Sequence, residues 1–306
     1  MKARSALRGL AVGGASLILG ACSAGYGDDA PAAGTAPRPP ESAAVPPASP
    51  APAAAVFSLS GELTQGGWVR GTAPAGTTKL TLDGAPLPLD PDRSFFAAFD
   101  RDAGRNAMLA AEFANGQRME KPLSIAPRSW NIEHINAARR PDGPTEAFLA
   151  KRRPELARIE AARAVNAASD GWRQRFIWPV KGRISGRFGS QRIYRGEPGA
   201  YHGGLDISTG ASGTPFVAPA DGVVVLAAQT PFTLEGYLLI VDHGAGLNSA
   251  FLHCSAILVR EGERVKQGQT IGRIGATGRA TGPHLHWGIK WRDARLDPLL
   301  FLPEPM

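Results

Sequence analysis

The sequence predicts a mainly β protein whose C-terminal part is a compact antiparallel β domain. Glycine and proline are abundant, at 37 and 26 of 306 residues, which is too many for a helical bundle and is typical of turn-rich β structure. From residue 176 onward, short apolar runs alternate with glycine-containing turns. The strands expected there span residues 222–227, 237–241, 249–253, 270–274 and 284–290. We assign residues 173–306 to this domain, a length that is sufficient for a hydrophobic core of its own.

The first 22 residues contain the segments of an export signal in their usual order. Basic residues precede the apolar residues 10–19, which are too few and too rich in glycine to span a bilayer as a helix. The run ends in Leu19-Gly20-Ala21-Cys22. This arrangement resembles the lipobox of bacterial lipoproteins, which implies that residues 1–21 are a signal peptide and that Cys22 is lipidated. An ordinary secretory signal with an unrelated cysteine is the alternative.

The predicted lipid anchor places the chain in the cell envelope. Several acyl chains hold a protein to a membrane far more firmly than one. Ser23 stands where a retention signal for the inner membrane usually has aspartate, so we expect the outer membrane, on the side that faces the periplasm. Cys254 is the only other cysteine. With Cys22 lipidated it has no disulfide partner within the chain, so it is expected to be a small buried residue.

Residues 22–55 are expected to form an extended tether. Between residues 30 and 55, 8 of 26 residues are proline and 11 are alanine, so this segment cannot bury a core. In polyproline II geometry it would reach on the order of 80 Å at about 3.1 Å per residue.

Residues 56–127 read as short strands between turn signals, among them Asp83-Gly84 and Asn115-Gly116. Several short strands at this spacing predict a small β-sandwich. It resembles the immunoglobulin-like modules of bacterial surface proteins. No residue in it carries a chemical signature, so a spacer and an adapter that binds the cell wall remain equal alternatives.

Residues 128–172 are expected to be a short helical connector. Pro144 and Thr145 would open one helical stretch, and Pro154 fits the first position of a second, because proline lacks only a donor that is unpaired there. Four arginines lie around this segment, at positions 152, 153, 158 and 163. They could touch an anionic partner, although a solvated helix face is the commoner explanation for such residues.

Five of the six histidines lie in the last domain, and four residues form two spaced pairs. His202 and Asp206 are four residues apart, and the two glycines between them argue against a helix. On an extended segment this even spacing directs both side chains to one face. His284 and His286 are two residues apart, so a strand would also direct both rings to one face. The two segments side by side would bring three nitrogens and a carboxylate together.

Such a mixture of donors suits a zinc ion. Three protein ligands and an open fourth position are the catalytic pattern, whereas structural zinc sites are closed and usually rich in cysteine. A chain with one cysteine outside the lipobox cannot build the second kind of site. A single histidine would more often be a core or turn residue than a ligand. Two spaced pairs in one β domain favour a metal site.

The motifs of residues 180–298 resemble those of the lysostaphin-type (LytM-like) zinc metallopeptidases, which cut peptide cross-links in bacterial cell walls. The matching segments are His202-x-x-x-Asp206, the Asp221-Gly222-Val223-Val224 strand, His253 at the end of a strand, Gly268-Gln269-x-Ile271-Gly272 and residues 278–286, which end in His284-Leu285-His286. The resemblance does not extend to residues 30–170.

Carried over by position, the resemblance implies roles for five residues. His202, Asp206 and His286 match the ligands of one zinc ion per chain, whereas His253 and His284 match the catalytic base and the residue that stabilises the transition state. The sequence leaves open which of these two does which. Cys254 replaces a leucine that is common in the family, and we expect it to be buried rather than a ligand. His243 is expected in a turn, and His134 outside the domain is expected to have no role.

The leading hypothesis is therefore a lipid-anchored zinc endopeptidase that acts on peptidoglycan, with the D-Ala–diaminopimelate cross-link as the expected bond. In a wall bridged by glycines, a Gly–Gly bond would be the target. The formal net charge of +7 suits a polymer rich in carboxylates. Nucleic acid is not expected as a partner, because no motif of aromatic and basic residues accompanies this charge. The alternative is a non-catalytic activator of other wall hydrolases, and a regulatory protein partner in the envelope fits both hypotheses.

Overall fold

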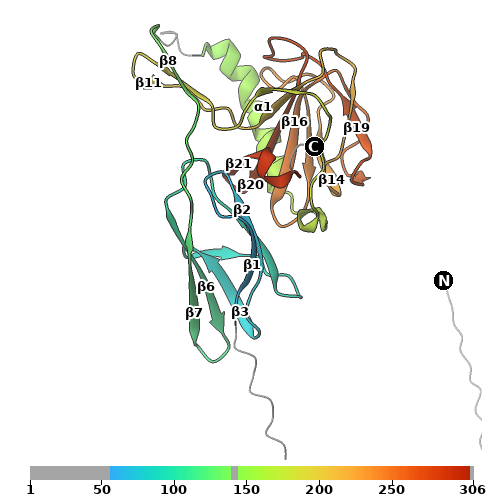
Figure 1. Ribbon diagram of the computed structural model, residues 1–306. Helices are drawn as coiled ribbons and strands as arrows, with labels where there is room; N and C mark the ends of the chain where they lie inside the picture. The colour runs from blue at the N-terminus through green and yellow to red at the C-terminus, as the bar shows by residue number, and fades with distance from the viewer. Residues whose placement is uncertain (1–55, 139–143, 304–306) are drawn as a thin grey trace, which may run out of the picture. The chain divides into compact units, whose positions relative to one another are not determined.

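The computed structural model describes residues 56–138 and 144–303, and it confirms a mainly β protein with antiparallel sheets (Figure 1). The predicted signal peptide, the lipidation of Cys22 and the tether lie outside the described residues. In the described part, one α-helix occurs among 21 strands, and this helix is not apolar enough to cross a membrane.

Seven strands between residues 58 and 124 form two antiparallel sheets, in the orders β1-β2-β5 and β4-β3-β6-β7. Asn115-Gly116 lies in the tight connection between β6 and β7, as its sequence predicts, and Gly116 has φ +80°. Val69, Leu80 and Leu109 are buried in the core. The bounds are β1 Ser58–Glu62, β2 Trp68–Thr72, β3 Thr77–Leu82, β4 Ala85–Leu87, β5 Ser94–Ala98, β6 Asn106–Phe113 and β7 Arg118–Ser124. The relation to immunoglobulin-like modules stays a prediction.

The connector differs from its prediction in two ways. It begins with a strand, β8 (Ile132–Ile135), which pairs in parallel with β10 (Gln191–Tyr194). It then contains one helix, α1 (Glu146–Ala164), instead of two helical stretches, with Pro154 inside it. Thr145 caps the start of α1, because its hydroxyl oxygen accepts a hydrogen bond from the amide of Phe148 at 3.2 Å.

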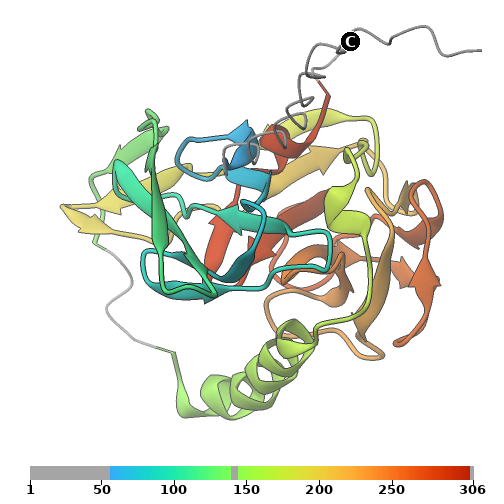
Figure 2. The same cartoon turned by 90° about the horizontal axis from the view of Figure 1, so that it is seen from below.

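Contacts with the C-terminal domain hold α1 together across Pro154. The guanidinium of Arg152 donates two hydrogen bonds of 2.6 Å to the carboxylate of Glu235. The carboxylate of Glu155 accepts hydrogen bonds from the backbone and the hydroxyl of Thr233 at 2.6 and 2.7 Å. A proline inside a helix costs about 3 kcal/mol, and sequence spacing alone does not reveal that these tertiary contacts offset it. Figure 2 shows α1 from below.

The main sheet of the C-terminal domain has eight strands in the order β18-β14-β15-β16-β20-β12-β9, with β21 paired to β20. The predicted strands fall within one or two residues of the observed ones. The bounds are β9 Arg183–Gly186, β12 Leu205–Ser208, β14 Gly222–Ala227, β15 Tyr237–Asp242, β16 Leu247–Cys254, β18 Arg264–Val265, β20 Leu285–Trp291 and β21 Ala294–Leu296. A smaller sheet contains β13 (Pro215–Val217), β19 (Thr270–Arg273) and β17 (Ala256–Ile257), and β11 (Glu197–Pro198) pairs with β10.

Strand β20 separates the core of this domain from the face that carries the chemistry. Its odd-numbered residues, Leu285, Trp287, Ile289 and Trp291, are buried, whereas its even-numbered residues are only partly buried. Alternate side chains of a strand point to opposite faces. The apolar half of β20 therefore anchors the strand, and the other half is left for function.

The two β regions of the described chain also contact each other directly. The ring of Phe96 in β5 lies 6.1 Å from that of Trp68 and 6.2 Å from that of Trp291, centroid to centroid. Arg128 donates to the buried carboxylate of Asp297 at 2.8 Å. Within the described residues, both regions therefore belong to one compact unit.

Candidate metal centre

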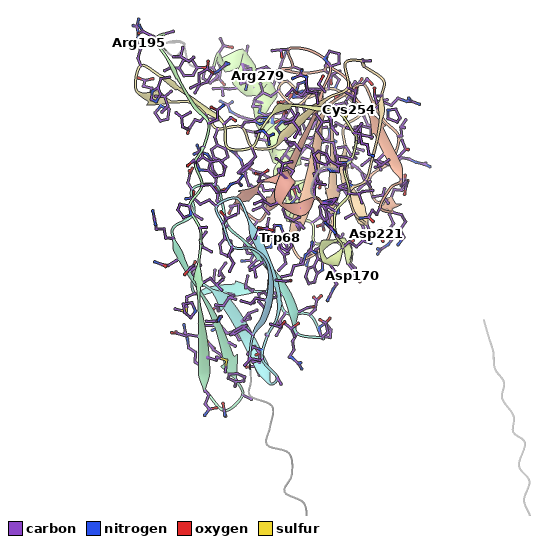
Figure 3. The ribbon with its side chains drawn as sticks, in the orientation of Figure 1. Trp68, Asp170, Arg195, Asp221, Cys254 and Arg279 are labelled. Atoms are coloured by element: carbon purple, nitrogen blue, oxygen red, sulfur yellow. The ribbon has the colours of Figure 1, made fainter. Side chains whose placement is uncertain are left out.

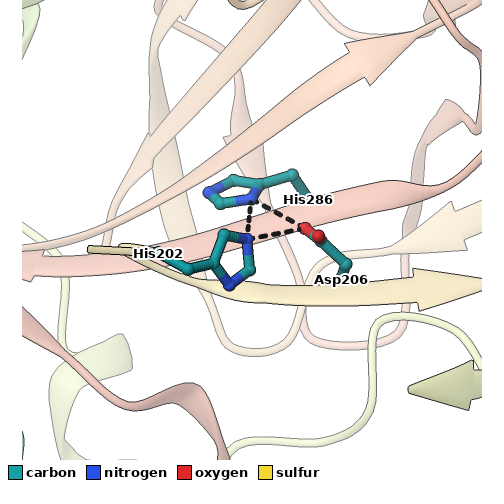
Figure 4. Close-up of side chains that lie close together, drawn as sticks. All are labelled: His202, Asp206 and His286. Atoms are coloured by element: carbon teal, nitrogen blue, oxygen red, sulfur yellow. Dashed lines mark hydrogen bonds and ion pairs between the residues drawn. The ribbon is translucent and has the colours of Figure 1, made fainter. Parts of the chain in front are cut away.

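Three side chains with metal-ligating atoms converge where β12 meets β20. Asp206 and His286 are directly opposite each other in the antiparallel pair, so their side chains leave the same face of the sheet. His202 comes from the extended segment just before β12. Nε2 of His202 lies 3.0 Å from Oδ1 of Asp206 and 3.0 Å from Nδ1 of His286, and the last two atoms are 2.8 Å apart (Figure 4).

The donor set fits a zinc ion. One donor atom from each of the three residues lies within 4.8 Å of the others, and two imidazole nitrogens with a carboxylate oxygen form a three-ligand set with an open position. The remaining nitrogen of His202, Nδ1, lies 3.0 Å from the carbonyl oxygen of Arg187. A ligating histidine commonly donates its second nitrogen in this way, which fixes the ring and leaves Nε2 with its lone pair toward the metal.

The pKa shifts of Asp206 and His286 agree with this geometry. For His202, burial acts to lower the pKa, but the hydrogen bond to Asp206 outweighs it and raises the pKa of this ring. Burial disfavours the charged form of Asp206, but the hydrogen bonds from His202 and His286 outweigh it and hold the pKa of Asp206 well below its ordinary value. Burial lowers the pKa of His286. A carboxylate and a neutral imidazole are the forms that bind a metal.

Two glycines allow the neighbouring backbone to approach the cluster. A Cβ at Gly186 in β9 would lie within 2.4 Å of Oδ2 of Asp206, and a Cβ at Gly204 would lie within 2.7 Å of Nε2 of His286. Any larger residue must therefore displace a side chain of this cluster.

We expect the Gly186→Ala variant to bind zinc at least about tenfold more weakly while it remains folded, the size of effect seen when groups supporting a metal ligand are disturbed. The added methyl group displaces the carboxylate of Asp206. Zinc affinity measured against a competing chelator checks this. Gly104→Ala is the control, because a Cβ there meets nothing within 4 Å. Equal zinc affinity for both variants would contradict the role of Gly186.

His253 and His284 line the same cavity, of about 510 Å³, as the three clustered residues. Nδ1 of His253 lies 2.9 Å from the carbonyl oxygen of Thr277, and Nδ1 of His284 lies 2.8 Å from that of Gly282. The two ring centroids are 4.9 Å apart. Because a carbonyl oxygen accepts a hydrogen bond, each ring donates through Nδ1 and keeps Nε2 as a proton acceptor. His253 has φ +64°, which orients its ring at the end of β16.

The remaining histidines and the cysteine lie apart from the cluster. Cys254 is buried, and burial raises the pKa of its thiol to about 12; Figure 3 shows it among the strands of the C-terminal domain. His243 does follow β15 at a turn, but it is a fully buried core residue. Its two nitrogens lie 2.8 Å from the carbonyl oxygen of Asp221 and 2.8 Å from the hydroxyl of Ser249. His134 is exposed on β8.

Sequence reasoning did not place four cationic residues in the cavity, one of which, Arg279, belongs to the motif at residues 278–286. The other three, Arg163 from α1, Lys290 from β20 and Arg295 from β21, line the cavity together with the histidines. The spacing of Lys290 carried a signal, because it continues the even-numbered face of β20 that begins at His286. No sequence signal places Arg163 there, since α1 reaches the cavity only through tertiary packing.

Residues 200–298 match the model of peptidase family M23. Among curated proteins, the chain is 40% identical over 117 residues to the peptidoglycan DD-endopeptidase ShyA of Vibrio cholerae, covering 38% of this chain and 26% of ShyA. It is 38% identical over 139 residues to the lipoprotein NlpD/LppB homolog of Pseudomonas aeruginosa, a match that covers 45% of this chain and 41% of that protein. It is 36% identical over 129 residues to the murein hydrolase activator NlpD of Escherichia coli, a match that covers 42% of this chain and 31% of that protein. The chain thus spans less than half the length of these relatives.

The solved structures extend the similarity upstream of the family match. A crystal structure of a candidate peptidase M23 from Pseudomonas aeruginosa superposes with a TM-score of 0.60 and 27% identity, covering 78% of this chain and 95% of that one. This coverage exceeds residues 173–306, so part of the upstream β region or of the connector shares the fold as well.

Proposed function

The C-terminal domain belongs to peptidase family M23, and from this premise we propose that the chain is a zinc-dependent endopeptidase that hydrolyses peptide cross-links of bacterial peptidoglycan. The observation that carries the proposal is the complete set of five side chains around one cavity: His202, Asp206 and His286 as zinc ligands, with His253 and His284 beside them. The D-Ala–diaminopimelate bond is the proposed target, which the similarity to ShyA, named as a peptidoglycan DD-endopeptidase, supports.

The residues of this chain have separate tasks in the proposed reaction. Zinc held by His202, Asp206 and His286 would supply a Lewis acid that polarises the scissile carbonyl and lowers the pKa of a water. His284 would accept the proton of the attacking water at Nε2, because its Nδ1 is engaged by the carbonyl oxygen of Gly282 and its Nε2 faces the cluster, 3.8 Å from Oδ1 of Asp206. His253 would stabilise the transition state through its own ring, whose centroid lies 4.9 Å from that of His284.

The second candidate is an activator of other wall hydrolases, because the chain is also similar to proteins named as murein hydrolase activators. A domain that serves only to bind a partner needs neither a converging donor set nor two histidines with free acceptor nitrogens. The geometry therefore favours the enzyme, and a regulatory protein partner in the envelope is compatible with either function.

We also propose an anchor and a location. Lipidation at Cys22 would hold the chain to the outer membrane, facing the periplasm, with residues 22–55 as the tether, residues 56–127 and 128–172 as the intervening regions, and residues 173–306 as the peptidase domain. The similarity to a Pseudomonas aeruginosa protein named as a lipoprotein supports this.

The test is digestion of purified cross-linked peptidoglycan by the full-length chain in detergent, with and without a zinc chelator. We expect cross-linked muropeptide dimers to decrease, the chelator to stop this, and added zinc to restore it. Mass analysis of the products identifies the bond. Intact dimers in the presence of a zinc-loaded chain would contradict the endopeptidase, and a gain of cleavage only when a second hydrolase is added would show the activator.

A further inference from the structure

Two cations face each other in the wall of the cavity that holds the proposed metal site. Lys290 in β20 and Arg295 in β21 are directly opposite each other in an antiparallel pair. Like charges in this position destabilise a sheet. The only ion pair of Lys290 within the described residues is with Asp293, whose carboxylate is 3.6 Å away and fully exposed, and such a surface pair contributes little.

A third cation comes to the same place from a different part of the chain. Ala162 at the end of α1 is buried against the apolar side chains of Leu226 and Ile240, which positions the adjacent Arg163 in the wall of the cavity. Nε of Arg163 is buried and has no hydrogen-bond partner among the described residues. Burial, together with the charge of Arg295, lowers the pKa of Arg163 to about 10.

The acidic residues around the cavity are already engaged. Asp206 belongs to the metal cluster, and the carboxylate of Glu235 accepts two hydrogen bonds from Arg152. Asp100 accepts hydrogen bonds from the backbone of Arg295 and from the hydroxyl of Tyr201. Within the described residues, neither Arg163 nor the side chain of Arg295 forms an ion pair. Three cations thus converge, and within the described residues the exposed Asp293 is the one carboxylate that pairs with any of them.

We propose that Arg163, Lys290 and Arg295 form a subsite that binds a free carboxylate of the peptide substrate. This inference rests on the proposed function for the reaction but makes a separate claim about substrate choice. His286, Gly288 and Lys290 share one face of β20, which places Lys290 about 13 Å along the strand from His286. An extended peptide spans this length in three or four residues. The subsite therefore selects a carboxylate that lies a few residues from the scissile amide.

The test compares two soluble cross-linked peptide dimers that differ only in whether their carboxylates are free or amidated. We expect amidation to raise KM of the zinc-loaded full chain about tenfold, the equivalent of one charge-assisted hydrogen bond. Arg163→Gln and Lys290→Gln should raise KM for the free-carboxylate dimer by a similar factor and leave kcat and the amidated dimer unchanged. Arg163→Lys should recover part of the loss.

Arg153→Gln is the matched control, since Arg153 lies on the same helix but is exposed and pairs with the exposed Glu146. Thermal unfolding and zinc content verify that each variant is intact. Equal KM values for the two dimers, or variants that impair both dimers alike, would overturn the subsite. Where neither dimer is cleaved, the binding of the same two dimers is measured by calorimetry. Tighter binding of the free-carboxylate dimer would support the subsite and contradict only the proposed endopeptidase reaction. Equal binding would contradict both the subsite and the reaction.

Discussion

The Asp206→Ala variant is expected to lose stoichiometric zinc and to lose cleavage of cross-linked peptidoglycan by a factor of about a thousand or more. Asp206 supplies the only carboxylate among the three clustered residues, and its Oδ1 lies within hydrogen-bond distance of both partner histidines. Its removal leaves two imidazoles without the negative charge that offsets the dication, and zinc chemistry contributes several kcal/mol to the transition state. Zinc per chain and the rate of dimer loss are measured on the same preparation.

The control for this variant is Asp170→Ala, because Asp170 is exposed and pairs only with a neighbouring arginine. His202→Ala should behave like Asp206→Ala. Stoichiometric zinc in either His202→Ala or Asp206→Ala would defeat the assignment of the ligands, even if cleavage were lost.

Replacement of His253 is expected to separate zinc binding from catalysis. His253 lies outside the cluster of ligating atoms, so zinc should remain bound at one ion per chain while kcat falls about 10²- to 10⁴-fold, the usual size of an acid–base or charge-stabilising contribution. The backbone of His253 has φ +64°. His253→Asn is therefore the better variant than His253→Ala, since asparagine tolerates this conformation.

Zinc content and kcat of the His253→Asn variant check this expectation, with His134→Asn as the control on an exposed strand. A variant that has lost its zinc would show that His253 supports the metal site. A variant with unchanged kcat would remove His253 from the reaction and leave His284 alone beside the metal.

The strands of the C-terminal domain and the shared face of each spaced pair could be predicted from local spacing. Even-numbered positions of β20 share a face whatever the rest of the chain does, so His284 and His286 could be placed together from two residues of separation. The prediction that Asp206 pairs with His286 depended on the resemblance to a known family. The register between two strands 80 residues apart cannot be predicted from the sequence of either segment alone.

The connector could not be predicted in the same way. Pro154 is a strong local signal for the start of a helix, yet α1 continues through it because Arg152 and Glu155 bind the segment around Glu235. The burial of His243 was missed for a similar reason: a sequence of Asp-His-Gly indicates a turn, but the surrounding core determines which way the ring points. In both cases tertiary contacts outweighed local preference.

The placement of Arg163 on α1 has a consequence for modularity. Residues 200–298, the span that the family model matches, contain the zinc ligands but not α1, and they also leave out β9 with Gly186, whose backbone lies against the carboxylate of Asp206. A graft of that span onto another protein would carry the proposed zinc ligands together with Lys290 and Arg295, but it would lack Arg163, the third cation of the proposed subsite. Two proteins with the same C-terminal core could then differ in substrate preference through the segment that precedes it. Exchange of this preceding segment would let such domains diversify without a change in the core.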